Sequence, residues 1–342
     1  MKTNTLQDNM RQARGKCSAQ DILRTLTGAS SVVITGHIRT DGDSLGSMIA
    51  LAHLLNRAGV RAVAAGKRHE LGAPGFLRGA ELLIPPRIAA RRAHDLLVTV
   101  DCGSPDRLPE PFQKRLGNCP VVNIDHHVTN TRFGTFNWVD AKATAAGEMI
   151  WRLARTAAWP LDDIAAEALW VALVTDTGRF AYDSVKPSTL RCAADLLRHG
   201  VRTSAINDTL YASFSVTNME LKRRAFKTLT LIDNGKIAAV SLTGKDFEET
   251  DGVKADAEDV IDIPRNLAGN RVAFFFYGDE DDASETRVSI RTREPLNAAA
   301  FAMRFGGGGH PCAGGCTINK PLGVARKLVL KAAEDWIAEH GW

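Results

Sequence analysis

The sequence predicts an α/β protein with a parallel sheet covered by helices on both faces and, after a helical connector, a smaller α/β domain. Short apolar segments alternate with helical stretches along the first half of the chain. Each apolar segment is largely continuous, which is typical of strands buried on both faces. The chain has 342 residues, which is long for one hydrophobic core, so two domains are expected.

The first domain is expected at residues 20–200. Its predicted strands are residues 31–36, 60–66, 95–101 and 120–125. Its predicted helices are residues 44–58, 161–176 and 186–200, with glycine stops after the first and at the end of the last. The stretch up to Asp21 is polar and lacks the apolar core of a signal peptide, so we expect a polar arm there.

The remaining chain divides into a helical connector at 201–230 and a second domain at 231–342. The second domain's predicted strands are residues 236–242, 270–278 and 286–292, and its predicted helices are residues 296–306 and 324–342. Four consecutive glycines occupy positions 306–309.

Composition and charge limit the class of protein. Apolar residues make up 44% and charged residues 24%, as in soluble globular proteins, and no run of 18 apolar residues exists. We therefore expect a cytoplasmic protein without a membrane partner. The net charge of +4 allows an anionic substrate without requiring one. Assembly into a homodimer is left open.

The six cysteines are scattered along a chain with no export signal, so reduced thiols are expected. Cys312 and Cys316 could form half of a zinc site, but no second pair accompanies them.

Acids and imidazoles follow several of the predicted secondary-structure elements at their carboxyl ends. A parallel sheet carries its chemistry beyond those ends. A lone Asp after a strand is usually a turn or helix cap, and a lone His is usually structural. Turns, caps and structural histidines are a much weaker explanation when such residues from four chain segments are expected at the same edge of the predicted sheet. The candidates are His37, Asp41, Asp43, Asp101, Asp125, His126, His127 and Asp176.

This set of side chains predicts a metal site. Carboxylates with neutral imidazoles suit Mn²⁺, Zn²⁺, Fe²⁺ or Co²⁺, and the excess of oxygen favours Mn²⁺ or Mg²⁺. Even six ligands drawn from these eight candidates are too many for one catalytic ion that keeps a position open. Two ions about 3.5–4 Å apart, sharing one carboxylate, would use them. The natural chemistry of such a pair is phosphoester hydrolysis.

His126 and His127 are adjacent, which raises the question of whether they share a role. Successive side chains of an extended chain point to opposite sides. We therefore expect the two imidazoles to point apart and to act differently.

Four motifs in this order carry a resemblance to a known family. They are "HIRTDGDSLGS" (37–47), "VTVDCG" (98–103), "NIDHH" (123–127) and "VTDTGRF" (174–180). They resemble the four motifs of the DHH phosphoesterase superfamily, which is named for the Asp125-His126-His127 triplet. The match spans about 30–180, and its order and spacing make it far more specific than the triplet alone.

The C-terminal part supports the same resemblance. "SIRT" (289–292) followed by "RFGGGGHPCAGG" (304–315) is similar to the glycine-rich signature of the DHH-associated C-terminal domain. With both halves present, the chain resembles the bacterial bifunctional oligoribonuclease and phosphoadenosine-phosphate phosphatase family, the nano-RNases. The resemblance implies hydrolysis of short oligoribonucleotides and dinucleotides, removal of the 3′-phosphate from 3′-phosphoadenosine 5′-phosphate (pAp), or both.

The resemblance also implies roles for individual residues. His37 and Asp41 would bind one metal, and Asp43, His126 and Asp176 would bind the other. Asp101 would bridge the two ions, with Mn²⁺ expected and Mg²⁺ or Co²⁺ as alternatives. His127 would act on the substrate, and Asp125 would orient an imidazole N–H from behind.

The glycine-rich segment is expected to form a shaped loop that binds the substrate. Consecutive glycines let the backbone approach a ligand and aim N–H groups at anions. The resemblance implies that this loop holds the part of the nucleotide that is not cleaved. The expected substrate-binding residues are Arg291, Gly307, Gly308, Gly309 and His310. No row of spaced aromatics suggests a platform for long nucleic acid, so a substrate of about two to five nucleotides is favoured over a long duplex.

Other functions remain open from the sequence. Within enzymes, the alternatives are a phosphodiesterase for linear or cyclic dinucleotides and an inorganic pyrophosphatase similar to family II. The alternative outside enzymes is a nucleotide-binding regulator with an inactive metal site. Every expected ligand position holds a ligand residue type, which favours catalysis.

Overall fold

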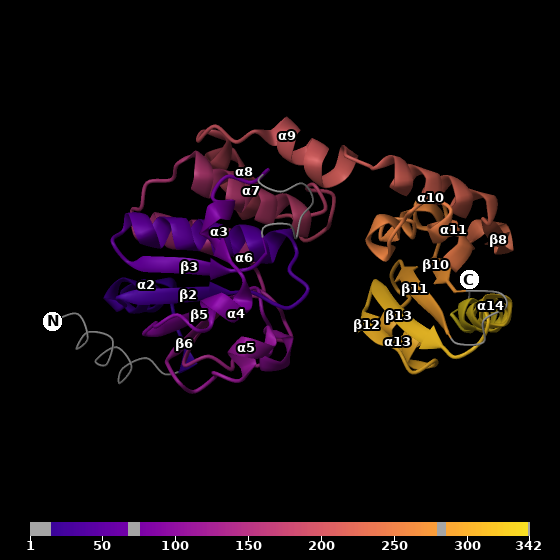
Figure 1. Ribbon diagram of the computed structural model, residues 1–342, viewed down its shortest axis with the longest axis horizontal. Helices are drawn as coiled ribbons and strands as arrows, with labels where there is room; N and C mark the ends of the chain where they lie inside the picture. Colours follow the sequence, from indigo (N-terminus) through magenta and orange to yellow (C-terminus); the bar gives the residue numbers. More distant parts are fainter. Residues whose placement is uncertain (1–14, 68–75, 279–284, 341–342) are drawn as a thin grey trace. The chain divides into compact units, whose positions relative to one another are not determined.

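The computed structural model describes residues 15–67, 76–278 and 285–340. The chain separates into two compact units, with the division between Ser213 and Phe214 (Figure 1). The first unit contains a seven-stranded sheet in the order β1-β7-β6-β5-β2-β3-β4, and every neighbouring pair in it is parallel. The predicted α/β class with a parallel sheet and a second, smaller unit is confirmed.

The strands of the first sheet alternate in sequence with helices. The strands are β1 (Gly15–Lys16), β2 (Ser31–Thr35), β3 (Arg61–Ala65), β4 (Leu83–Ile84), β5 (Leu96–Val100), β6 (Val121–Asp125) and β7 (Phe136–Val139). The helices are α2 (Ala19–Gly28), α3 (Gly42–Arg57), α4 (Pro86–Ala89), α5 (Glu110–Gln113), α6 (Ala146–Thr156), α7 (Asp163–Asp176), α8 (Pro187–Leu197) and α9 (Thr203–Asn207). All residues of β5 and β6 are buried, as expected of strands covered on both faces.

Alternation along the strands divides the apolar side chains between two cores. In β2, Val32 and Ile34 join the larger core, and Val33 joins the smaller one. The larger core is built with α2, α3, α6, α7 and α8, and the smaller one with α4 and α5. The helices therefore cover both faces of the sheet.

Part of the expected N-terminal arm belongs to the first sheet and its helices. We expected a polar arm up to Asp21, but β1 and the start of α2 lie within that stretch. Ser18 and Asp21 form a reciprocal capping box that begins α2. Residues 1–14 of the expected arm lie outside the described residues.

The second unit contains a six-stranded sheet in the order β12-β13-β11-β10-β9-β8. Its strands are β8 (Thr230–Ile232), β9 (Ile237–Leu242), β10 (Val272–Tyr277), β11 (Thr286–Thr292), β12 (Gly308–His310) and β13 (Ala313–Ile318). Only β9 and β10 are parallel. Its helices are α10 (Val216–Lys227), α11 (Gly244–Glu248), α12 (Asp262–Arg265), α13 (Ala298–Met303) and α14 (Leu322–Glu339).

The second sheet is also covered on both faces. One core joins it to α13 and α14, and another joins it to α10, α11 and α12. The glycine-rich segment, which we expected to be a loop, contributes β12 and leads through a turn into β13. None of the described helices, in either unit, has the length and apolar character required to cross a bilayer.

Candidate active site

The candidate residues converge where the strand order of the first sheet reverses. The strands β6, β5 and β2 are neighbours in the sheet, although β3 and β4 separate β2 from β5 in the sequence. The carboxyl ends of strands at such a reversal form the usual ligand site of a doubly wound sheet. His37 follows β2, Asp101 follows β5, and Asp125 is the last residue of β6.

Two helices bring further acids to the same edge. Asp41 is the N-cap of α3 and accepts a hydrogen bond from the Ser44 backbone N–H at 3.0 Å. The helix α7 ends at Asp176. The helices α3 and α7 approach closely at Gly46, where a Cβ atom would lie 2.1 Å from the carbonyl oxygen of Ala168. A glycine is therefore required there.

The acids and imidazoles form two groups that meet at Asp101. In the first group, His37 Nε2 lies 3.4 Å from Asp41 Oδ2 and 3.3 Å from Asp101 Oδ2. In the second group, His126 Nε2 lies close to three carboxylates. These distances are 3.6 Å to Asp43 Oδ2, 3.5 Å to Asp176 Oδ2 and 3.4 Å to Asp101 Oδ1. The two oxygens of Asp101 therefore face different groups.

The backbone holds Asp101 in an uncommon conformation. Its φ angle is +51°, in the left-handed region that few residues other than glycine adopt. Its N–H donates to the Ile124 carbonyl oxygen at 3.0 Å, and the residue is 2% exposed. Strain of this kind is often found at functional sites.

The carboxylate of Asp43 is fixed by the start of α6. Its two oxygens accept the backbone N–H groups of Ala146 at 2.6 Å and Gly147 at 2.9 Å. Ser47 Oγ also donates to Asp43 Oδ1 at 3.1 Å. A helix N-terminus stabilises negative charge, so the start of α6 holds this acid without the help of a lysine or an arginine from the described residues.

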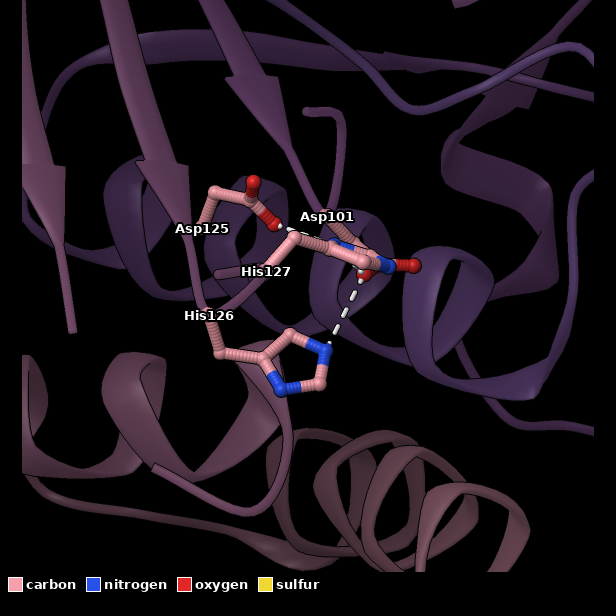
Figure 2. A group of neighbouring side chains, drawn as sticks. All are labelled: Asp101, Asp125, His126 and His127. Carbon is pink, nitrogen blue, oxygen red and sulfur yellow. Dashed lines mark hydrogen bonds and ion pairs between the residues drawn. The ribbon is translucent and has the colours of Figure 1, made fainter. Parts of the chain in front are cut away.

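The shortest contact of His127 is with Asp125, which forms no ion pair with His126 (Figure 2). His127 Nδ1 lies 2.8 Å from Asp125 Oδ1, and Asp125 is fully buried. Asn130 Nδ2 donates to Asp125 Oδ2 at 2.5 Å and to Asn123 Oδ1 at 2.8 Å. The bond to Asp125 places the proton of His127 on Nδ1, so that Nε2 faces away from this acid.

The prediction that His126 and His127 point to opposite sides is wrong. Their ring centroids are 4.8 Å apart, and His127 Nδ1 is also 3.5 Å from Asp101 Oδ1. The strand β6 ends at Asp125, so the alternation of an extended strand does not apply to the two histidines. Their difference comes from Asp125, which contacts His127.

The buried charges of the site shift the pKa values of its members. Burial, together with the charges of Asp101 and Asp176, raises the pKa of Asp43 well above its usual range. Burial likewise raises the pKa of Asp176 to about 6. Burial lowers the pKa of His126, but the bond to Asp101 and the surrounding acids outweigh it and raise the value to about 10. The cluster therefore favours additional positive charge.

The donors present are suited to divalent cations. Atoms of His37, Asp41 and Asp101 lie within 4.8 Å of one another, as do atoms of Asp43, His126 and Asp176. Throughout the described ranges, no lysine or arginine forms an ion pair with these four carboxylates. Carboxylates with imidazoles are ligands for Mn²⁺, Zn²⁺ and related ions. No comparable cluster forms around Cys312 and Cys316 among the residues described.

The predicted substrate-binding residues lie together in the second unit. Arg291 on β11 is paired with Ala313 on β13, and Ala313 is paired with His310 on β12. Gly308 and Gly309 belong to the same edge strand, and Gly307 precedes it. Arg291 donates to the Ile290 carbonyl oxygen at 3.0 Å. The side chain of His310 lies outside the described part of the structure.

Sequence reasoning missed two sets of residues at this site. Asn123 and Asn130 support Asp125, and the backbone N–H groups of Ala146 and Gly147 hold Asp43. The first set could have been found from the sequence, because Asn123 is a polar residue within the buried strand β6. The second set left no signal, because any residue type supplies a backbone N–H.

Comparisons with known proteins agree with this arrangement. The model of the DHH family, N-terminal domain, matches residues 31–175, and the model of the DHHA1 domain matches residues 234–339.

Individual relatives are similar over most of the chain. The "Bifunctional oligoribonuclease and PAP phosphatase NrnA" of Bacillus subtilis (strain 168) is 27% identical over 306 residues, covering 87% of this chain and 92% of the relative. The protein of the same name from Thermus thermophilus is 28% identical, with 94% of each chain covered. A crystal structure of an exopolyphosphatase-related protein from Bacteroides fragilis has a TM-score of 0.83 at 22% identity, covering 93% of this chain and 96% of that one.

Proposed function

We propose that this chain, which joins a DHH family N-terminal domain to a DHHA1 domain, hydrolyses short oligoribonucleotides and pAp. It is a metal-dependent hydrolase of phosphoester bonds. The names of the relatives from Bacillus subtilis and Thermus thermophilus support both substrate types. The products would be mononucleotides from the RNA and a nucleoside monophosphate from pAp.

One observation carries the proposal: the carboxylate of Asp101 lies between two groups of ligand-type side chains. Its Oδ2 faces His37 at 3.3 Å, and its Oδ1 faces His126 at 3.4 Å. We propose that His37 and Asp41 hold one divalent cation, that Asp43, His126 and Asp176 hold another, and that Asp101 contacts both. Mn²⁺ is the proposed ion, because oxygen donors predominate.

When bound, the two ions supply Lewis acidity, which polarises a phosphoryl oxygen and makes a water more acidic. The chain's own residues supply the proton chemistry. The bond to Asp125 raises the pKa of His127, so its imidazole is readily protonated. We propose that His127 Nε2 donates its proton to the leaving oxygen as the P–O bond breaks.

The second unit would bind the part of the substrate that is not cleaved. Arg291 and His310 occupy one row across three neighbouring strands, beside the glycine backbone of β12. A guanidinium and backbone N–H groups are suited to phosphate oxygens. We propose that Arg291, Gly307, Gly308, Gly309 and His310 position the nucleotide in this way.

The test is a comparison of substrates. Metal-free protein would be reloaded with Mn²⁺ and assayed on di- to pentaribonucleotides, pAp, a cyclic dinucleotide and pyrophosphate, with Asp101→Asn as the inactive control. We expect the wild type to turn over the short RNAs and pAp, and we expect Asp101→Asn to turn over neither. Turnover of pyrophosphate alone would instead indicate a pyrophosphatase. Nucleotide binding without turnover of any substrate would indicate a regulator.

A further inference from the structure

The turn that follows Asp176 has an unusual backbone. Gly178, Arg179 and Phe180 have φ angles of +55°, +61° and +63°. Three consecutive left-handed residues are rare, and Arg and Phe both incur a steric cost in this region. A glycine or asparagine would adopt it more easily. The presence of Arg179 at this position therefore calls for an explanation other than chain geometry.

Several contacts hold the turn in place despite this cost. The Arg179 N–H donates to the Val174 carbonyl oxygen at 2.8 Å, and the Phe180 N–H donates to Thr177 Oγ1 at 3.0 Å. The ring of Phe180 packs edge-on against Trp170, with centroids 5.7 Å apart. The direction of the chain just after Asp176 is thus fixed by its surroundings.

The guanidinium of Arg179 lies on an aromatic ring. Its carbon Cζ is 4.8 Å from the centroid of Tyr211, whose hydroxyl donates to the Val174 carbonyl oxygen at 3.3 Å. Arg179 is exposed, and it forms no ion pair within the described ranges. A guanidinium held over an aromatic ring still carries N–H donors that can bind an anion.

A second exposed arginine lies on the neighbouring loop. Arg39 stands between His37 and Asp41 and has no acid partner among the residues described. The start of α3, which follows this loop, lies against the end of α7, because a Cβ atom on Gly42 would lie 2.3 Å from Thr175 Cγ2. Arg39 therefore lies three residues before this contact, and Arg179 lies four residues after it.

We propose that Arg179 and Arg39 bind a second, non-scissile phosphate of the substrate on the first unit. The inference rests on the proposed function and adds a requirement for a substrate with two phosphates. The proposed metal ligands include four carboxylates. The cations neutralise their negative charge only locally, so the carboxylates still repel those parts of an anionic substrate that lie away from the cations. Two guanidinium groups at the edge of this cluster would offset that repulsion and orient the nucleotide.

The experiment compares matched substrates that differ by one phosphate. The pairs are pAp with adenosine 3′-phosphate, and 5′-phosphorylated ApA with unphosphorylated ApA. The variants are Arg179→Gln, Arg39→Gln and the double variant. Arg155→Gln is the control, because Arg155 is also exposed and stacked on a ring, that of Trp151, but lies on α6 and pairs with Asp195.

We expect each single variant to lower kcat/KM about 10- to 100-fold on the two-phosphate substrates and less than about threefold on their partners. The salt dependence of log kcat/KM should decrease in slope by about one for each lost contact. Arg155→Gln should match the wild type on all four substrates. An equal loss on both members of each pair would overturn the inference, since the arginines would then serve the fold or the metal site.

A further variant separates binding from stability. Arg179→Gly relieves the left-handed strain, so its melting temperature should equal or exceed that of the wild type while turnover of pAp falls. Loss of stability together with turnover would identify Arg179 as structural. Calorimetric binding of pAp to Asp101→Asn, with and without Arg179→Gln, tests the arginine even if the wild type hydrolyses none of the substrates. In that event the proposed function fails, and equal binding by the two variants would show that the arginine proposal fails as well.

Discussion

The two units carry their candidate functional groups in contrasting ways. In the first unit the site is made of side chains, and its central acids Asp43 and Asp101 are almost completely buried, at 1% and 2% exposure. In the second unit the predicted site is largely backbone, on the edge strand β12 and the glycine that precedes it. Activity at the first site should therefore fall when a substitution removes a charge or a polar atom from one side chain. Substrate binding at the second site should weaken when a substitution adds a side chain to one of its glycines.

The first unit also supports its site with hydrogen bonds from residues outside the metal-binding candidates. Asp43 is held by α6, and Asp125 is held by Asn130 and, through it, by Asn123. Partners of this kind fix ligand orientation, and their loss typically costs activity without unfolding the protein. Tolerance of substitution should differ between the two units accordingly.

The largest effect is expected for Asp101→Asn, which keeps the size of the side chain but removes its charge. Because the two carboxylate oxygens face separate groups, turnover should fall by about 10³-fold or more. Metal content by mass spectrometry should fall as well. Asp106→Asn, at a nearby exposed position in the chain, is the control and should behave as the wild type. Retention of more than about a tenth of the rate would exclude a shared-ligand role for Asp101.

The second effect separates two adjacent histidines. His126→Ala should lose metal, because His126 Nε2 faces three carboxylates of the cluster. His127→Ala should keep its metal and lose about 10²- to 10⁴-fold in kcat, which is the range for a positioned proton donor. His94→Ala, at a half-buried histidine of the same unit outside the cluster, should change neither quantity. Equal loss of metal in both variants would contradict the division of roles.

The third effect tests the support behind His127. Asn130→Ala removes a hydrogen bond of 2.5 Å to Asp125 and should lower kcat about 10- to 100-fold with metal content unchanged. Asn118→Ala changes an exposed asparagine in the same unit and should have no effect. If Asn130→Ala raised KM and left kcat unchanged, Asn130 would contribute to substrate binding instead of orienting His127.

The contrast between the units also explains what the sequence could predict. Strands such as β5 and β6 were predictable because continuous apolar runs are needed where a strand is buried on both faces. The ligand-type residues were predictable as a group because they follow secondary-structure elements at their carboxyl ends. Their partners were not, since Asn130 reaches Asn123 only after the loop beyond β6 has folded back.

Backbone features were the least predictable. The N–H groups of Ala146 and Gly147 hold Asp43 from 103 and 104 residues away in the chain, and no residue type marks them. The glycines at 306–309 suggested a loop, because isolated glycine runs have no strand propensity. Pairing with β13 makes part of the segment a strand, so tertiary contacts override the local preference.

The fourth effect concerns the side chain of the second site. Arg291→Gln should lower kcat/KM about 10- to 100-fold on pAp and dinucleotides, because it removes the charge-assisted hydrogen bond that we propose between Arg291 and the nucleotide. A simple aryl phosphate ester has no nucleotide part for Arg291 to bind, so kcat/KM on this substrate should change little. Arg287→Gln is the matched control, because Arg287 lies earlier on the same strand, β11, and is exposed. An equal loss on the aryl ester and the nucleotides would show that Arg291 supports the fold or the metal site.

The smallest effect distinguishes two adjacent glycines. A Cβ atom on Gly307 would lie 2.2 Å from the Gly315 carbonyl oxygen, whereas a Cβ atom on Gly308 would meet nothing within 4 Å. Gly307→Ala should therefore destabilise the second unit by about 1–3 kcal/mol, measured by denaturant unfolding. Gly308→Ala should change stability by less than about 0.5 kcal/mol.

Gly308→Ala then tests function alone, because its structural cost is small. If a nucleotide approaches the backbone of β12, the added methyl group occupies the space that the substrate needs. We expect KM for pAp to rise about two- to tenfold with little change in kcat, which indicates weaker binding in both ground and transition states. The aryl phosphate ester serves as the control substrate and should be unaffected. Unchanged kinetics on pAp would mean that the substrate does not contact this strand at Gly308, and the contrast between a side-chain site and a backbone site would then be wrong.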